Sequence, residues 1–356
     1  MTKQITVISP GPLTLIQDGG RFGFQQLGVS VSGAIDIEAL NVGNRLVGND
    51  PDSSALEITL GDAEFEFVQS SVFALTGAET DARLDDVPLL RNVSYTAYPG
   101  ARIFIGTIRP HQGLRSYLAI AGGVDSLIVL GSRSTHIDSE TGGVEGRALQ
   151  AGDVLKIGEP IVTSRSGRFA AYSGLDSFAD CLDIRVILGP QEDQFSEAGI
   201  QTFLESPYVV TQQSNRQGLR LSGPEIESST GGYDIVSDAI VNGSIQVSGD
   251  RQPIILLADR QPTGGYPKIA AVVTVDIPAL GQATPGTSIT FSAVSVEEAQ
   301  ELLVKRSNLL SDLTLDRMVE PISLQIGTQN ISVGITEKES SRLAYIDGTT
   351  YPFSIE

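Results

Sequence analysis

The sequence predicts a mainly β protein built from barrels or sandwiches, with only a few short helices. Glycine and proline are frequent, at 38 and 17 of 356 residues, which is typical of chains with many turns. Alternation over residues 63–67 places two glutamates on one face and apolar side chains on the other, as in a half-buried strand. Short apolar runs bounded by turn residues recur at 5–9, 64–68, 72–75, 103–108, 115–119, 183–188, 254–257 and 288–291.

Three segments have the pattern of helices. Residues 36–47 begin at a suitable N-cap, Asp36, and carry apolar side chains at helical spacing. Residues 192–204 follow a proline and have two phenylalanines eight positions apart. Ser295 and Glu298 form a capping-box pattern, which predicts a third helix beginning there.

Composition limits the classes of partner and the cellular location. The formal charge is 24 − 43 = −19, and a polyanion is repelled by nucleic acids and by anionic membrane surfaces. No apolar stretch is long enough to span a bilayer, and the N-terminus lacks a signal peptide, so we expect a cytoplasmic protein. The single cysteine, Cys181, lies in an apolar run and is predicted to be a core residue.

The chain is expected to contain two β-barrel domains and a β-rich extension. The polar stretch 163–167 is the best internal boundary, and a second change of pattern falls near residue 312. These boundaries give domains at 1–165, 166–311 and 312–356. The last segment carries strand patterns at 322–326, 331–335, 342–346 and 351–355, with an Asp347-Gly348 hairpin signal.

Several classes of site are disfavoured by missing motifs. Neither His111 nor His136 has a partner at metal-ligand spacing, and a Gly-x-Ser-x-Gly elbow is absent. His111 follows a proline and is predicted to be a solvated turn residue. The sequence contains no Gly-x-x-x-x-Gly-Lys-Ser/Thr loop and no Gly-x-Gly-x-x-Gly after a strand. A biotinyl lysine normally sits between two methionines, but Met1 and Met318 stand alone, so we expect no covalent biotin on this chain.

Two polar groups near the N-terminus are candidate binding residues. Asp18 and Arg21 fall within one glycine-rich turn, where arginine offers a planar fork for carboxylate or phosphate; a local structural pair is the alternative, and spacing alone favours it. Asn41 and Asn44 share a helix face, and their amides are suited to a urea-like or lactam-like group. Fixing backbone at the helix end is an equally good interpretation.

Two arginines around a glycine form a second candidate. Arg216 and Arg220 are four positions apart, so in an extended segment they point to the same face. Such a pair would bind an anion or brace a sheet through salt bridges.

The densest polar cluster is the run DRQPTGGYPK at residues 259–268, between two apolar strands. Asp259 is a candidate base or amide acceptor, Tyr266 a hydrogen-bond donor and Lys268 an anion partner. A polar bulge on a barrel rim is the structural alternative.

These segments, in this order, resemble the family of the 5-oxoprolinase C subunit, also called the biotin-dependent carboxyltransferase or allophanate hydrolase subunit 2 family. The resemblance covers roughly residues 5–305. It departs from the family where QGL (217–219) replaces the common Met-Gly-Tyr, and where Pro262 replaces a common threonine. Its motifs are PGPLTLIQDGGR (10–21), GVSVSGAID (28–36), RSYLAIAGG (115–123), LGSRST (130–135), GPQEDQF (189–195), SNRQGLRL (214–221), GSIQV (243–247) and the stretch 252–270.

The resemblance implies a pair of tandem cyclophilin-like β-barrels. It also implies ATP-dependent opening of the 5-oxoproline lactam to glutamate, by a complex with A and B subunits that uses ATP with Mg²⁺. The matching catalytic positions would be Asp259, Tyr266 and Lys268. The matching substrate-binding positions would be Asp18, Arg21, Asn41, Asn44, Arg216, Arg220, Thr263, Gly264 and Gly265.

Two other functions remain open at this level. One is the carboxyltransferase component of a biotin-dependent urea or amide carboxylase, with the biotin on a separate carrier. The other is a regulatory antagonist of a histidine-kinase inhibitor, whose function is to bind a B-type partner.

Overall fold

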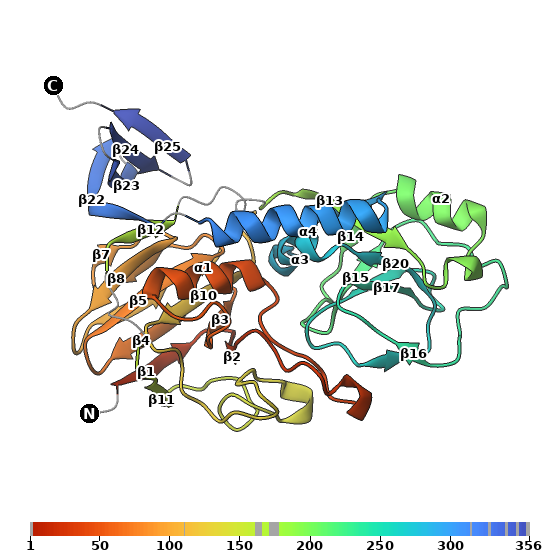
Figure 1. Ribbon diagram of the computed structural model, residues 1–356, viewed down its shortest axis with the longest axis horizontal. Helices are drawn as coiled ribbons and strands as arrows, with labels where there is room; N and C mark the ends of the chain where they lie inside the picture. Colours follow the sequence, from red (N-terminus) through yellow and green to blue (C-terminus); the bar gives the residue numbers. More distant parts are fainter. Residues whose placement is uncertain are drawn as a thin grey trace. The chain divides into compact units, whose positions relative to one another are not determined.

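The computed structural model in Figure 1 describes residues 3–109, 111–160, 166–170 and 178–313, and strands at 315–326, 329–338, 341–346 and 349–353. Strand residues make up 35% and helical residues 18%, so the prediction of a mainly β fold is confirmed. Among the described helices, none combines the length and the apolar character that crossing a membrane requires.

The chain divides into two compact units, each assembled from separate stretches. Unit 1 comprises Met1–Gly19, Ile37–Ser177 and Asp312–Glu356, and unit 2 comprises Gly20–Asp36 and Phe178–Ser311. The boundaries predicted from the sequence differ, since they place residues 20–36 in the first barrel and residues 312–356 in a domain of their own. The predicted internal boundary at 163–167 lies mostly outside the described residues.

Unit 1 contains a six-stranded and a ten-stranded sheet in its described part. The six-stranded sheet has the order β11 (Val154–Ile157), β1 (Lys3–Pro10), β4 (Ala63–Phe67), β9 (Arg102–Ile105), β6 (Ala82–Leu84) and β7 (Val87–Pro88). The ten-stranded sheet has the order β2 (Leu13–Gln17), β3 (Ala55–Thr59), β10 (Arg115–Ile120), β5 (Ser71–Gly77), β8 (Val93–Ala97), β12 (Arg168–Ala170), β22 (Leu315–Ile326), β23 (Gln329–Lys338), β24 (Ser341–Ile346) and β25 (Thr349–Phe353).

One apolar core lies between these two sheets. In β4 the side chains alternate as predicted, and Phe65 and Phe67 are fully buried. The Phe67 ring stacks on Phe73 of β5 with centroids 5.2 Å apart, which joins the two sheets across the core. Buried aromatic pairs of this kind contribute roughly 0.5–1.5 kcal/mol beyond their area burial.

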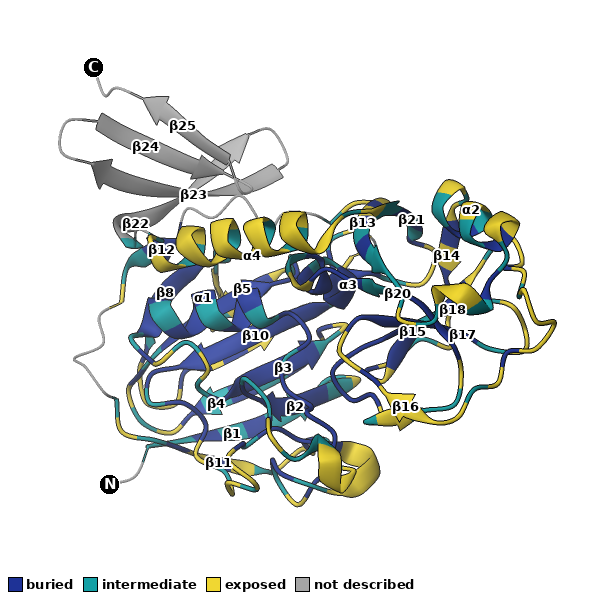
Figure 2. Ribbon diagram, turned by 45° about the vertical axis from the view of Figure 1, so that its right-hand side comes forward, coloured by how far each residue is buried: buried dark blue, intermediate teal, exposed yellow. Residues whose placement is uncertain are grey.

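Helix α1 (Ile37–Val47) packs on β5 and β10 of the ten-stranded sheet, as Figure 2 shows. A Cβ added at Gly43 would lie 3.1 Å from Thr76 Oγ1 and 3.2 Å from the Ala119 side chain, so glycine permits the close approach. Thr76 Oγ1 also donates a hydrogen bond of 2.7 Å to the Ala39 carbonyl. The helix predicted at 36–47 is therefore confirmed, one residue shorter at its start.

The C-terminal strands continue the ten-stranded sheet. β22 pairs antiparallel with β12, and β23, β24 and β25 follow as a meander. The four strands predicted after residue 312 are thus present, with β22 and β23 longer than expected. Ile346 lies opposite Thr349, while the Asp347-Gly348 turn itself lies outside the described residues.

Unit 2 is built on a closed seven-stranded barrel. Its first and last strands pair in parallel, and the other neighbours run antiparallel. The barrel order is β13 (Cys181–Leu188), β20 (Lys268–Val272), β17 (Ser244–Val247), β18 (Pro253–Leu256), β15 (Gly218–Ser222), β14 (Tyr208–Val210) and β21 (Ser288–Ala293).

Unit 2 also contains three α-helices, short 3-10 helices and a small ribbon. The α-helices are α2 (Glu197–Glu205), α3 (Ile277–Gln282) and α4 (Val296–Ser311), and the ribbon pairs β16 (Asp238–Ala239) with β19 (Thr263–Gly264). The capping box at α4 is confirmed, because Ser295 and Glu298 exchange backbone-to-side-chain hydrogen bonds of 2.8 and 3.1 Å.

The prediction that Cys181 is a core residue is wrong, because its side chain is exposed. Cys181 begins β13, whose burial alternates so that Leu182 and Ile184 face the barrel core. An apolar run in a strand with one face inside places every second side chain in solvent.

Candidate functional site

Residues 20–36 are fastened to the loop that follows β18 of the barrel. The Ser32 amide donates 3.0 Å to the Ala258 carbonyl, and Ser30 Oγ donates 3.0 Å to the Arg260 carbonyl. A Cβ added at Gly281 of α3 would lie 3.2 Å from the Asp36 amide nitrogen. Residues 257–260 thus lie beneath a covering segment of unit 2, and this burial controls the chemistry of their side chains.

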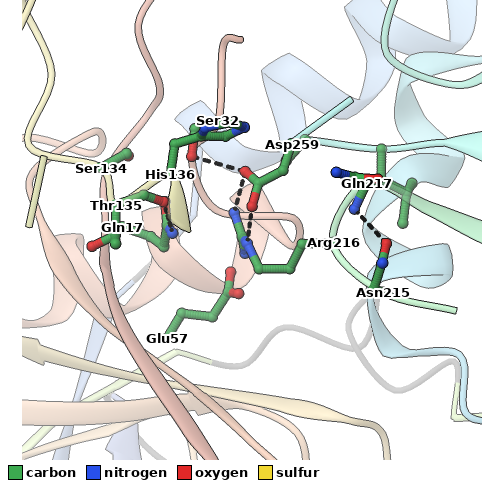
Figure 3. A network of polar contacts seen from close by, with 12 residues as sticks. Gln17, Ser32, Glu57, Ser134, Thr135, His136, Asn215, Arg216, Gln217 and Asp259 are labelled. Carbon is green, nitrogen blue, oxygen red and sulfur yellow. Dashed lines mark hydrogen bonds and ion pairs between the residues drawn. The ribbon is translucent and has the colours of Figure 1, made fainter. Parts of the chain in front are cut away.

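A buried ion pair lies at the centre of this region. Arg216 donates from Nε to Asp259 Oδ2 at 2.7 Å and from Nη2 to Oδ1 at 3.1 Å, and the residues are 5% and 8% exposed. Ser32 Oγ donates to the same Oδ1 at 2.8 Å, as Figure 3 shows. Arg216 Nη2 also donates to the Gly33 carbonyl at 2.7 Å. Both carboxylate oxygens of Asp259 therefore already accept hydrogen bonds in this structure, and its role as a base or amide acceptor stays a prediction.

The pair predicted from Arg216 and Arg220 is not brought together as one anion site. Arg216 is buried, whereas Arg220 is exposed in β15. The residues before β15 form a turn in which Asn215 Oδ1 accepts from the Gln217 and Gly218 amides at 2.8 and 3.3 Å. Because the extended segment begins only at Gly218, the two-residue alternation does not reach back to Arg216.

Arg260 is a second buried arginine in the same loop, at 6% exposure. Its guanidinium donates from Nη1 to the Leu257 carbonyl at 3.1 Å and from Nε to the Ile240 carbonyl at 3.4 Å. Burial lowers the pKa of Arg260 to about 10, and the neighbouring Asp259 carboxylate partly opposes that shift. The candidate residues predicted from the sequence do not include Arg260.

Lys268 forms the second polar centre of unit 2. Its side chain is 3% exposed, and Nζ donates 2.8 Å to Asp238 Oδ2. Gln191 joins the pair, since its Nε2 donates 2.9 Å to the same oxygen and its Oε1 accepts 3.1 Å from the Lys268 amide. The hydrogen bond from Lys268, with those from the Ala239 amide and Gln191, lowers the pKa of Asp238 to about 2. Asp238 is therefore a half-exposed carboxylate that stays ionised at neutral pH.

The two-residue ribbon and its glycines hold this centre in place. Asp238 lies opposite Gly264 in the β16–β19 pairing. A Cβ added at Gly264 would lie 2.6 Å from Ile240 Cδ1 and 2.8 Å from Gln246 Nε2, so glycine allows both side chains to pack against the ribbon. Gln246 Nε2 donates 3.1 Å to the Tyr266 carbonyl. Thr263 is exposed, Gly265 is half-buried and the Tyr266 side chain is 41% exposed.

Replacing Lys268 with methionine is expected to raise the pKa of Asp238 from about 2 towards the ordinary value near 4, because its main hydrogen-bond donor is lost. The folded-state pKa lies below the unfolded one, so the contribution of the pair to stability is present above about pH 4 and is lost as the pH falls towards 2. A carbon-13 NMR titration of the carboxyl resonance measures this shift. An unchanged titration would contradict the pairing.

Asp18 organises a loop of unit 1. Its carboxylate accepts from Ser132 Oγ at 2.6 Å, from Ser134 Oγ at 2.5 Å and from the Arg133 amide at 2.6 Å. The preceding Gln17 donates 2.9 Å from Nε2 to the Thr135 carbonyl. Asp18 therefore holds the loop at residues 132–134, which lies more than 100 positions further along the chain.

The Asp18→Ala variant is expected to lose about 3 kcal/mol of unfolding free energy, because two hydroxyls and an amide lose a charged acceptor. Exchange of the Arg133 amide hydrogen should also become faster. Urea denaturation and hydrogen exchange measure both effects. Asp81→Ala is the matched control, since the Asp81–Arg83 pair is half-exposed and should contribute far less to stability than the contacts of Asp18.

The other N-terminal candidates occupy separate positions. Arg21 is 1% exposed and belongs to unit 2, whereas Asp18 belongs to unit 1. Asn44 donates from Nδ2 to the Pro51 and Ser53 carbonyls at 2.9 and 2.7 Å, and thereby fixes the chain after α1. The structural interpretation of Asn44 is thus the one that its contacts support. Within the described residues, Asn41 Oδ1 is buried and has no hydrogen-bond donor.

Neither histidine belongs to the polar centres of unit 2. His111 is an exposed turn residue with φ of 66°, as predicted. His136 caps a short helix of unit 1, where Nδ1 lies 2.7 Å from Ser139 Oγ. The described part of the chain contains no group of three or more His, Cys, Asp or Glu side chains that could hold a metal ion.

The structure adds polar residues that the sequence patterns do not single out: Ser32, Gln191, Asp238, Gln246 and Arg260. Ser32 and Gln191 lie inside motifs already noted, at 28–36 and 189–195, so they were within reach of the pattern. Asp238 follows no motif and pairs with a lysine 30 positions away. Asp238 lies in the ribbon formed by β16 and β19, and Gln191 bonds both Asp238 and the Lys268 amide.

Comparison with known proteins gives one family for most of the chain. Residues 27–293 match the family described as "Carboxyltransferase domain, subdomain A and B". The chain is 41% identical to the 5-oxoprolinase C subunit of Escherichia coli over 295 residues, which is 83% of this chain and 93% of that protein. It is 36% identical to the 5-oxoprolinase C subunit of Haemophilus influenzae over 298 residues, 84% of this chain and 94% of that protein.

A solved structure extends the similarity to a larger enzyme. The urea amidolyase of Kluyveromyces lactis superposes with a TM-score of 0.81 and 27% identity, covering 97% of this chain. This chain spans only 23% of the length of that amidolyase. The fold therefore occurs both in proteins of similar length and as one part of a much longer chain.

Proposed function

Because this chain belongs to the carboxyltransferase-domain family of subdomains A and B, we propose that it is the C subunit of an ATP-dependent 5-oxoprolinase. In this proposal it works with A and B subunits in the cytoplasm to open the 5-oxoproline lactam to glutamate. The observation that carries the proposal is the 41% identity over 93% of the length of the corresponding E. coli protein.

The Lys268–Asp238 centre is suited to an amide. An ionised, half-exposed Asp238 offers an oxygen to the lactam N–H, because Lys268 and Gln191 occupy mainly its other oxygen. The Lys268 ammonium has three N–H donors, and a lactam carbonyl gains negative charge when it is attacked. We therefore assign Asp238 to the lactam N–H and Lys268 to the carbonyl oxygen. Tyr266, exposed on the same loop, is assigned as a further hydrogen-bond donor.

The A and B subunits, the nucleotide and its metal belong to this proposal as well. Ring opening needs an activated carbonyl, and ATP with Mg²⁺ would supply the activation in the assembled complex. This chain lacks a Gly-x-x-x-x-Gly-Lys-Ser/Thr loop, and its described residues contain no carboxylate cluster for a metal. We accordingly assign no step of nucleotide chemistry to its side chains. In this proposal the chain also carries no covalent biotin.

The test is ATP-dependent release of glutamate from 5-oxoproline by this chain mixed with purified A-type and B-type subunits. We expect activity that disappears when this chain is omitted. If all three proteins assemble and no glutamate forms, the 5-oxoprolinase proposal fails. Tight binding to the B-type subunit without any activity would instead favour the regulatory function.

A carboxyltransferase acting on urea or another amide is the second candidate. The superposition on the urea amidolyase over 97% of this chain favours it. It requires a biotin carrier and a biotin carboxylase from elsewhere, and 5-oxoproline would not be consumed. Urea-dependent ATP consumption with those two components, in the absence of 5-oxoprolinase activity, would select it.

A further inference from the structure

The loop after β18 and the turn before β15 together bury two arginines and one aspartate. Arg216, Asp259 and Arg260 are all less than 10% exposed. Arg216 and Asp259 neutralise each other in a bidentate pair, whereas Arg260 forms no salt bridge with the described residues. A buried charge is costly unless it is paired, so the position of Arg260 calls for an anion.

The hydrogen bonds of Arg260 leave part of its guanidinium available. Arginine has five N–H donors in a planar fork. Within the described residues, its hydrogen bonds run from Nε and Nη1 to the Ile240 and Leu257 carbonyls, so Nη2 has no acceptor there. Two neutral carbonyls orient the group and supply no negative charge. A carboxylate fits the remaining edge of the fork.

Arg260 lies beside the centre that we assign to the lactam. Its partner Ile240 follows β16, two residues after Asp238, and the Ile240 amide donates 2.9 Å to the Pro262 carbonyl. The Ile240 side chain packs against the position of Gly264, opposite Asp238 in the ribbon. One short segment of unit 2 therefore contacts the buried arginine and supplies the carboxylate that pairs with Lys268.

We infer that Arg260 binds the free carboxylate of the substrate, while Asp238 and Lys268 hold its cyclic amide. The ligand class is a small lactam that carries a carboxylate on the ring. This inference rests on the proposed function for the identity of the reaction, but the preference for a carboxylate is a property of the binding site alone. Urea has no carboxylate and would leave the Arg260 charge without a partner.

The kinetic test compares 5-oxoproline with its uncharged carboxamide, 5-oxoprolinamide, in the assembled complex. Wild type should prefer 5-oxoproline by about 100-fold in kcat/KM, as expected for a charged hydrogen-bonded pair. Arg260→Met should remove that preference through a higher KM for 5-oxoproline, and change kcat/KM for the carboxamide less than threefold. Arg260→Lys, which keeps the charge without the fork, should retain part of the preference. An equal loss for both substrates would overturn the inference.

A matched control separates the carboxylate site from a structural function. Arg251→Met removes an arginine of unit 2 whose exposed side chain pairs with Glu225, and it should leave the preference unchanged. The unfolding midpoint of Arg260→Met should be no lower than that of wild type, because the replaced charge is buried and forms no salt bridge with the described residues. If Arg260→Met does not fold, the substrate preference is measured for wild type and Arg260→Lys alone. A wild type without a preference for 5-oxoproline, or an Arg260→Lys variant with the full preference, would then overturn the inference.

Direct binding distinguishes failure of this inference from failure of the proposed function. If the complex shows no 5-oxoprolinase activity, 5-oxoproline and 5-oxoprolinamide are titrated into the full-length chain by calorimetry. Binding of the carboxylate alone, abolished in Arg260→Met, supports the anion site for a different reaction. Equal binding of the two compounds, or binding of neither, overturns it.

Discussion

Replacing Arg216 with methionine is expected to lower the free energy of unfolding by about 3–5 kcal/mol, because the Asp259 carboxylate is left buried without its cation. The Gly33 carbonyl loses its donor at the same time, so residues 20–36 should be held less firmly on unit 2. Urea unfolding followed by circular dichroism measures the loss. Hydrogen exchange at the Ser32 amide reports the loosening of the segment.

An exposed ion pair of the same unit provides the control. Arg251→Met breaks the Arg251–Glu225 pair, whose side chains are 54% and 65% exposed, and should cost less than about 1 kcal/mol. The double variant Arg216→Met with Asp259→Leu should regain part of the stability, since no buried carboxylate is then left without its cation. If Arg216→Met and Arg251→Met lower the free energy of unfolding equally, the buried Arg216–Asp259 pair is no more important for stability than an exposed pair.

The second large effect is on activity. Lys268→Met should lower kcat of the assembled complex by about 100- to 1,000-fold, the range found when a preorganised donor to a developing oxyanion is removed. The fold should persist, because Asp238 is half-exposed and becomes hydrated. Steady-state kinetics on 5-oxoproline and a thermal unfolding curve test both points together.

Two further variants make this result specific. Lys305→Met replaces an exposed lysine of α4 and should leave kcat unchanged; Figure 2 shows that helix exposed along its length. Lys268→Arg keeps the positive charge with a different geometry and should recover only part of the activity. Full activity in Lys268→Met would remove Lys268 from the chemistry and leave it a purely structural partner of Asp238.

Local signals predicted most of the secondary structure. The alternation at 63–67 appears as β4, the N-terminal helix pattern as α1 and the capping box as the start of α4. Each of these patterns involves residues within a few positions of one another, so the local sequence was enough to predict the element. The exposed Cys181 shows the limit, because an apolar run does not reveal which of its side chains face inwards.

The site was predictable only in part, because its contacts join distant residues. The loop at 259–268 was recognisable as polar and glycine-rich, and it does contain Asp259, Arg260 and Lys268. Their different surroundings come from elsewhere: Ser32 reaches Asp259 across 227 positions, and Asp238 reaches Lys268 across 30. Periodicity and spacing describe one segment at a time. They therefore could not distinguish the buried Arg216–Asp259 pair from the half-exposed Asp238 carboxylate.

The division of the chain into interrupted units has a consequence for its synthesis. Residues 20–36 leave the ribosome long before the β18 loop whose Asp259 and Ala258 they contact. The segment forms its hydrogen bonds with Ala258 and Asp259 only after those residues have been synthesised, so unit 2 is completed by a late long-range closure. Such closure slows folding and prolongs the exposure of unfinished surfaces. A fragment of residues 178–311 expressed alone would lack that segment, and adding residues 20–36 as a separate peptide should restore part of its stability.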